Sequence, residues 1–228
     1  MCKLDIGTLN PNNCPNPAIG SPDGFFAELW QEAEFYRWQT LNSDFVQQLI
    51  SGTLSPDRYG RFVLLDLYYC LKAADDFLLA IENSQYDDDK SFLLNRYHDH
   101  IDYMGKAFAE WPINDPDSLT PSSTIKDFVA YQHRIADTDG GIYFVLAITP
   151  CMALWTWLGL LLNERVPKDS LYRHWVNVNQ VQEAPRSFAN HINKNIDRID
   201  KEKAAEIFRN CMRYECNMFR SGGHQPPL

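Results

Sequence analysis

Three side chains that could do chemistry interrupt apolar stretches of this sequence. Asp66 and Glu215 each fall in a row of apolar residues spaced three and four apart, and Cys151 lies in the uncharged run 140–162. Burial raises the pKa of a glutamate toward neutral pH, and a thiol becomes a nucleophile once a neighbour takes its proton. An aspartate among tyrosines can accept hydrogen bonds from an amidine-like edge. Together they predict a reaction centre; the alternative is two solvated or ion-paired carboxylates and a packing cysteine.

The uncharged run 140–162 is long enough to span a bilayer, so it could be a membrane span or a buried helix. Pro150 interrupts the run, Asp137 and Asp139 precede it, and no cluster of Lys or Arg flanks it. We therefore expect the buried central helix of a soluble domain. Because proline lacks a backbone N–H and clashes with the carbonyl four residues earlier, this helix should kink or start again at Pro150.

The remaining pattern predicts further helices and no strand of useful length. Residues 1–20 show no periodicity and should form a loosely ordered arm, followed by one helical domain over 21–228. The expected class is all-α. Helices are predicted from serine caps, helix-starting prolines and closing glycines at 21–36, 43–51, 55–83, 87–111, 120 or 123 to 133 or 135, 168–180, 185–199 and 201–219.

Composition narrows the functional class. The chain has 228 residues and a formal net charge of −9, and this charge argues against nucleic-acid binding. The first twenty residues lack the apolar core of a signal peptide, so we expect a cytoplasmic protein. The six cysteines show no paired spacing and should be free thiols. His98 and His100 could hold a metal beside Asp99 and Asp102, but a solvated surface is the favoured interpretation.

Three segments, in the right order, resemble the TenA/thiaminase II family. The segment FVQQLISGTLSPDRYGRFVLLDLYYC at 45–70 resembles the family's F-x-x-x-(I/L)-x-x-G-x-L phrase and the D-x-x-Y helix that follows it. AITPC at 147–151 resembles A-x-x-P-C, and YECNMF at 214–219 resembles the C-terminal Y-E phrase. The likeness extends over about residues 25 to 220.

The resemblance implies a haem-oxygenase-like helical bundle that forms a homo-oligomer, a tetramer or a dimer. It implies hydrolysis of a C–N bond in thiamine or a degraded aminopyrimidine, in thiamine salvage. By analogy Cys151 attacks the pyrimidine and Glu215 transfers protons to the leaving amine. Asp66 would orient the pyrimidine, with Tyr69 and Tyr214 beside it. No metal or organic cofactor is implied, and the expected partner is a small pyrimidine, neither nucleic acid nor a membrane.

Three pocket positions depart from the family. Phe128 and Trp155 stand where tyrosines are usual, although Tyr131 lies one turn after Phe128. Asn179 replaces a third tyrosine, four residues after Trp175. The aromatic replacements keep a stacking surface, but all three changes remove a phenol hydroxyl. We therefore expect these residues to line a pocket whose hydrogen bonds to the substrate differ from those of the family.

Two other functions fit the same fold. A non-catalytic relative could bind a small molecule in the same cavity, but retention of Cys151 and Glu215 favours an enzyme. A metal-dependent oxidase needs histidines and carboxylates at helical spacing on facing helices. His98, His133 and His174 form no E-x-x-H pattern.

Overall fold

A computed structural model describes residues 23–111, 113, 115 and 119–228. Within this part of the chain the regular elements are all helices, as expected. The predicted arm at 1–20 and the predicted helix start at Ser21 lie outside the described residues. The helices are α1 Phe25–Glu32, α2 Glu34–Leu41, α3 Asp44–Ser51, α4 Pro56–Glu82, α5 Asp87–Glu110, α6 Ser123–Thr138, α7 Gly141–Leu162, α8 Arg173–Val178, α9 Glu183–Lys194, the 3-10 turn η3 Ile196–Arg198 and α10 Lys201–Gly222.

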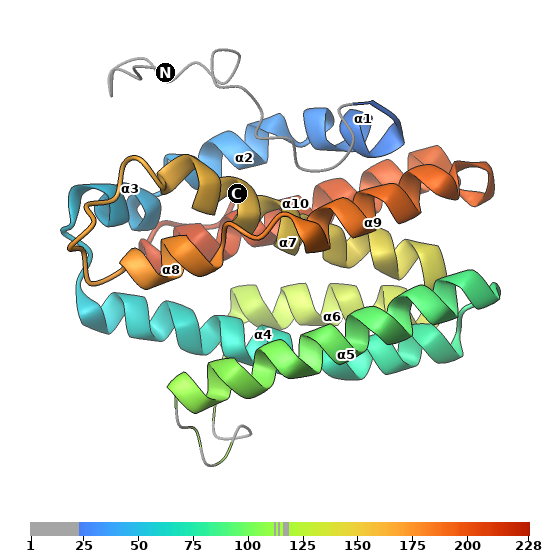
Figure 1. Ribbon diagram of the computed structural model, residues 1–228, viewed down its shortest axis with the longest axis horizontal. Coiled ribbons are helices and arrows are strands. Elements are labelled where there is room, and N and C mark those ends of the chain that lie inside the picture. The colour runs from blue at the N-terminus through green and yellow to red at the C-terminus, as the bar shows by residue number, and fades with distance from the viewer. Residues whose placement is uncertain (1–22, 112, 114, 116–118) are drawn as a thin grey trace.

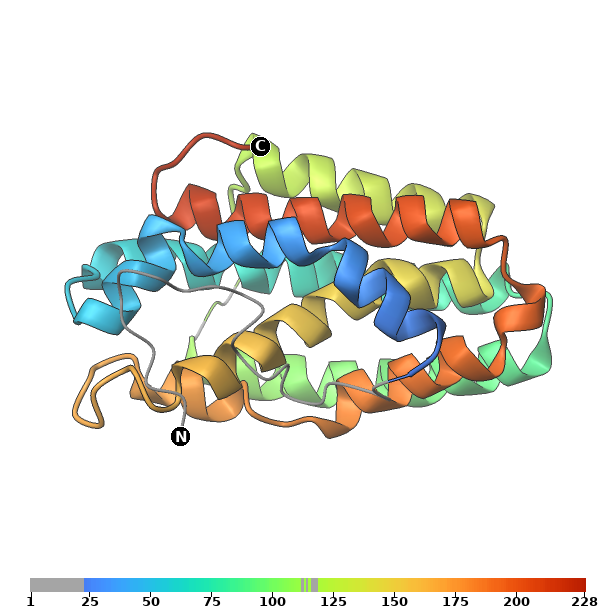
Figure 2. The ribbon, with the colours of Figure 1, turned by 90° about the horizontal axis from the view of Figure 1, so that it is seen from above.

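The helices form an elongated bundle around α7 (Figure 1). α4, α5 and α6 form one side of the bundle, and α1, α2 and α3 lie on the opposite side (Figures 1 and 2). α7 packs against α4, α5, α6, α8, α9 and α10. A helix surrounded in this way has no face for polar side chains, which explains its uncharged sequence.

The burial of α7 shows whether the uncharged run 140–162 is a core helix or a membrane span. α7 is long and apolar enough to cross a membrane, but 78% of its most apolar 18-residue window is buried inside the bundle. The prediction of a buried central helix is therefore confirmed. The helix runs through Pro150 without starting again, so of the two outcomes expected there, a kink or a new start, the second does not occur. Packing on every side holds the segment helical, and the proline removes only one backbone hydrogen bond.

Local signals set the start of the helices that carry the site. Ser55 caps α4 by accepting from the Arg58 N–H, with Pro56 in the first turn. Ser43 caps α3 in the same way, and Gly52 ends it with a φ of 69°. These starts agree with the prediction. The register of α4 turns Asp66 inward, in a row with Phe62 and Tyr69.

Several boundaries differ from the prediction. The first helix is interrupted at Ala33, and α8 occupies only 173–178 of the predicted 168–180 because residues 167–172 form turns. α6 is capped by Ser122, whose hydroxyl accepts from the Ile125 N–H, and runs on to Thr138. α9 begins at Glu183 and stops at Lys194, where η3 follows.

Candidate active site

The two predicted acids are both buried. Asp66 on α4 is 7% exposed and Glu215 on α10 is 1% exposed. Burial raises the pKa of Asp66 to about 7, opposed by a hydrogen bond from the Cys70 thiol, whose Sγ lies 3.9 Å from Asp66 Oδ1. Burial also raises the pKa of Glu215 to about 8. Both carboxyls therefore change protonation near neutral pH, as groups that exchange protons with a substrate must.

Cys151 lies beside Glu215, at the middle of α7. Burial raises the pKa of the Cys151 thiol well above its ordinary value, and the charges of Glu215 and Asp66 raise it further. The thiol is therefore protonated at neutral pH and needs a base to become a nucleophile. Glu215 can serve, because its interaction with the thiol perturbs both groups and its buried Oε1 has no other close partner.

Trp155 orients the second oxygen of this acid. Its indole Nε1–H donates to Glu215 Oε2 at 3.0 Å, and this hydrogen bond opposes the rise in the pKa of Glu215. The indole also stacks on Phe62, with ring centroids 5.6 Å apart. The tryptophan that replaces a family tyrosine thus donates to the acid as well as offering the stacking surface that we expected.

A cavity of about 250 Å³ opens beside Cys151. Five of the predicted site residues lie on its wall, namely Asp66, Tyr69, Cys151, Trp155 and Asn179. They come from α4, from α7 and from the end of α8. Glu215 is not on the wall and meets the cavity through its contacts with Cys151 and Trp155. The thiol and the two acids, carried by three helices, therefore belong to one site.

Gln132, which the sequence analysis missed, orients Tyr69. Its side chain on α6 is 1% exposed, and Nε2 donates to the Tyr69 hydroxyl oxygen at 2.9 Å and to the Ala147 carbonyl at 3.2 Å. The Tyr69 hydroxyl proton is therefore free to donate to a ligand. A signal for Gln132 was present, because it is a single polar residue in the apolar row that runs from Phe128 to Ile135.

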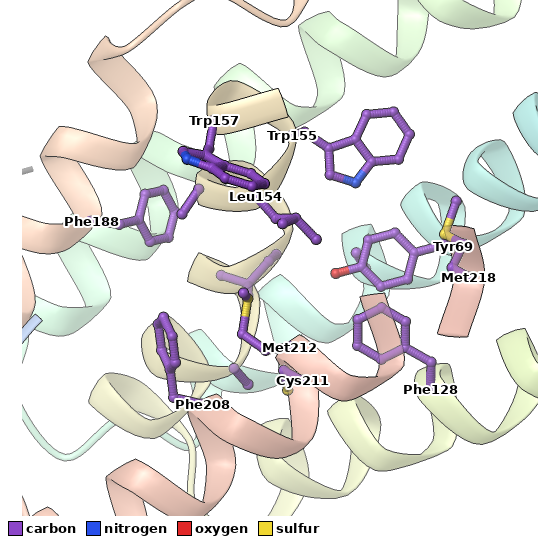
Figure 3. Close-up of a cluster of buried hydrophobic side chains, with 14 of the residues drawn as sticks. Tyr69, Phe128, Leu154, Trp155, Trp157, Phe188, Phe208, Cys211, Met212 and Met218 are labelled. Carbon is purple, nitrogen blue, oxygen red and sulfur yellow. The ribbon is translucent and has the colours of Figure 1, made fainter. Parts of the chain in front are cut away.

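Three predicted pocket residues lie outside this wall, so the expectation that they line the pocket is not met. Phe128 is fully buried and stacks between Tyr69, at 4.7 Å, and Tyr214, at 5.3 Å. Figure 3 shows Phe128 beside the Tyr69 ring. Tyr131 packs on Tyr214 at 5.4 Å and accepts a hydrogen bond from Asn210. Because α6 reaches the site from behind Tyr69, these rings support that side chain.

Asn179 is held at the rim of the cavity by a close approach of two helices. A Cβ atom on Gly159 of α7 would lie 2.1 Å from the Asn179 carbonyl oxygen, so only glycine fits there. The Asn179 side chain donates to the Trp175 carbonyl at 2.8 Å. Val178 and Val181 line the same rim and are 50% and 61% exposed, which opens the cavity to solvent on this side.

α5 supplies a wall that the sequence analysis did not foresee. Arg96, His100 and Tyr103 line the cavity, and their spacing of four and three residues places them on one helix face. His100 Nε2 lies 2.7 Å from the Cys70 carbonyl oxygen, so the expected solvated surface is wrong for this residue. The charge of Asp66, followed by burial, raises the pKa of Tyr103. The phenol of Tyr103 therefore lies near that carboxyl.

Among the residues that the structure describes, no three His, Cys, Asp or Glu side chains converge as metal ligands would. His133 Nδ1 pairs instead with Asp76 Oδ1 at 2.7 Å. His174 Nε2 lies 3.4 Å from Glu110 Oε1. Two of the three histidines considered for an oxidase are thus engaged with a single acid each.

Comparison with known sequences gives one distant curated relative. No protein-family model matches the chain. The chain is 23% identical over 183 residues to a protein of Corynebacterium efficiens described as thiamine biosynthesis multifunctional protein ThiED. This match covers 75% of the chain but only 24% of that protein, so the chain spans about a quarter of the length of its curated relative.

Solved structures identify the fold. A TenA family protein from Silicibacter sp., described as a transcription regulator, superposes with a TM-score of 0.78 at 15% identity, over 90% of this chain and 97% of the other. A TenA homologue from P. horikoshii gives 0.73 at 18% identity, over 89% and 99%. A putative TenA-like thiaminase from Sulfolobus solfataricus gives 0.69 at 18% identity, over 90% and 99%. The chain thus has the haem-oxygenase-like all-α fold of TenA proteins, as its motifs predict.

Proposed function

We propose that this protein is a TenA-like hydrolase that cleaves a C–N bond in thiamine or in an aminopyrimidine derived from it. The observation that carries the proposal is a half-buried thiol, Cys151, on the wall of a cavity that also holds Asp66, next to a buried acid, Glu215, with which it interacts so that each perturbs the pKa of the other. The described relatives include a thiamine biosynthesis protein and a TenA-like thiaminase, which supports this substrate class.

The reaction needs one nucleophile, one proton carrier and one water. Cys151 Sγ bonds to a carbon of the pyrimidine ring or to its exocyclic carbon, and the thiol proton passes to ionised Glu215. Glu215 then gives this proton to the departing amine as the C–N bond breaks or, when the leaving group is the thiazole of thiamine, which departs as a neutral molecule, to water. Water supplies hydroxide to the carbon and a proton to the sulfur, so the products are an alcohol, a free amine and the regenerated thiol.

Three other residues on the cavity wall, Asp66, Tyr69 and Trp155, bind the pyrimidine. Ionised Asp66 accepts from the ring's N–H edge, and its pKa of about 7 lets it ionise under neutral conditions. Tyr69, oriented by Gln132, donates a hydrogen bond to a ring nitrogen. Trp155 offers a flat apolar surface to the ring.

The test is incubation of the purified protein with thiamine, formylaminopyrimidine and aminopyrimidine, followed by measurement of released thiazole, formamide or ammonia. We expect Cys151→Ala and Glu215→Gln to abolish turnover and to leave the circular dichroism spectrum unchanged. Cys216→Ala is the matched control, because Cys216 is buried on the same helix as Glu215 but does not line the cavity. Full activity of the Cys151 variant would remove the nucleophile, and binding without turnover in the wild type would indicate a ligand-binding protein.

We also propose that the chain works in the cytoplasm as a homo-oligomer, a tetramer or a dimer. The free, buried thiols Cys70, Cys211 and Cys216 suit a reducing compartment. Light scattering coupled to gel filtration measures the assembly directly, and a monomeric mass at micromolar concentration would contradict it.

A further inference from the structure

The cavity extends well beyond the reactive thiol. α5 runs antiparallel beside α4 (Figure 1). Its residues Arg96, Asp99, His100 and Tyr103 line the cavity. Tyr103 on α5 lies at the end that holds Asp66, while Arg96 lies on the same face seven residues earlier. At 1.5 Å per residue these two positions are roughly 10 Å apart. The cavity therefore has a reactive end near Cys151 and a second end near Arg96.

The second end carries a guanidinium with spare hydrogen-bonding capacity. Arg96 Nη2 lies 3.1 Å from Asp99 Oδ2, but Asp99 is 65% exposed, and a pair of this kind adds little stability. Arg96 Nε is buried and has no hydrogen-bond partner. The aromatic rings of Phe77 and Phe188 line the cavity nearby and provide an apolar passage toward the thiol. A buried donor without an acceptor costs free energy unless a ligand satisfies it.

We propose, on the basis of the proposed hydrolase function, that Arg96 binds an anionic tail of the substrate, a phosphate or a carboxylate, at the end of the cavity away from Tyr103 and Asp66. A guanidinium presents parallel N–H donors that match both anions. The substrate is then an extended aminopyrimidine compound with a negatively charged end. This differs from an uncharged aminopyrimidine, which would leave Arg96 without a ligand.

The remaining groups on the wall do not oppose an anion at this end. Burial lowers the pKa of His100, so this ring is neutral at pH 7 and neither attracts nor repels it. Burial raises the pKa of Asp66 to about 7, and this carboxyl lies toward the far end, beside Tyr103. Asp99 is the only acid on the wall next to Arg96 among the described residues. Its exposed carboxylate can turn into water when the anion binds.

The test uses pairs of probes that share the aminopyrimidine, one member of each pair having a neutral tail and the other a negatively charged tail. Thiamine and thiamine monophosphate form the phosphate pair, and formylaminopyrimidine and its succinyl half-amide form the carboxylate pair. We expect the wild type to prefer the anionic member of one pair in kcat/KM, and the pair that responds identifies the anion. Arg96→Gln should reduce this preference by about 10- to 100-fold, mainly through KM, and Arg96→Lys should retain part of it.

Arg61→Gln is the matched control, because Arg61 has an equivalent ion pair with Asp57 but is exposed and does not line the cavity. It should leave the preference unchanged. A wild type that favours the neutral members, or an Arg96→Gln variant with the same preference, would overturn the tail site. If no probe is turned over, calorimetric binding of the same pairs decides. Anion-selective binding that depends on Arg96 would then support the tail site while the hydrolase proposal fails, and equal or absent binding would overturn the tail site.

Discussion

Trp155→Phe should move the pH dependence of the reaction to higher pH. The substitution keeps an aromatic surface but removes the Nε1–H that donates to Glu215 Oε2 at 3.0 Å. A hydrogen bond to an ionised group contributes about 1.5–3 kcal/mol, and 1.36 kcal/mol corresponds to one pKa unit. Because this bond stabilises the carboxylate form, its loss should raise the pKa of Glu215 by about one to two units above its value of about 8.

The assay is the pH profile of kcat/KM for whichever probe the wild type turns over. Glu215 must be ionised to accept the thiol proton, so the rate should rise with pH as this group deprotonates. In the variant the rising limb should lie about one to two pH units higher, with a rate that is about 10- to 100-fold lower at pH 7 and recovers in alkali. Asp66, with a pKa of about 7, contributes to the same limb, so the comparison concerns the apparent midpoint of the pair.

Trp175→Phe provides the control. Trp175 packs against Trp155 with ring centroids 5.5 Å apart, but its buried Nε1 has no hydrogen-bond partner. This variant loses indole area of the same kind and no hydrogen bond to the acid, so its midpoint should stay at the wild-type pH. An unchanged midpoint in Trp155→Phe, or equal shifts in both variants, would refute the role of this hydrogen bond.

Three further predictions concern stability, measured by urea unfolding. The pKa of Glu215 rises from 4.5 to about 8 on folding, so its ionisation favours unfolding and stability is lost between these pH values; Glu215→Gln should therefore raise the unfolding free energy by roughly 4 kcal/mol at pH 8 and hardly at pH 4. Gly159→Ala should cost at least about 2 kcal/mol, because its Cβ would lie 2.1 Å from a backbone oxygen, whereas Gly105→Ala, with open space around it, should stabilise by about 0.5–1 kcal/mol. Asp89→Ala should lower the unfolding free energy by about 3–5 kcal/mol, since it removes the buried carboxylate that lies 2.7 Å from His191 and 3.3 Å from Arg198; a loss below about 1 kcal/mol would contradict this prediction.

The sequence predicts the helices and the inward acids because these depend on local rules. Serine caps and helix-starting prolines act within one turn, and a three-and-four residue spacing fixes the face that a residue shares with its neighbours. Asp66 and Glu215 are found by this spacing alone. The same spacing also singles out Gln132, which is polar but uncharged and falls between Phe128 and Ile135 on one helix face.

The contribution of α5 and the contact between Trp155 and Glu215 could not be predicted in this way. α5 carries charged and polar residues on most of its surface, so the sequence does not show which face meets α4. The hydrogen bond from the indole joins residues 60 positions apart on two helices and depends on their relative rotation. Motif positions give the residue type, but Phe128 shows that a side chain at a family pocket position can pack behind the wall.

The place of α7 in the chain has a consequence for synthesis. Its uncharged surface is covered in large part by α9 and α10, which follow it, and α10 is the last helix of the sequence. A ribosome that has released residues up to 162 therefore presents an uncharged helix that α4, α5 and α6 can cover only in part, because α8, α9 and α10 have not yet been made. During that interval a chaperone or the neighbouring nascent helices must shield it, and a chain that stops before residue 201 should aggregate.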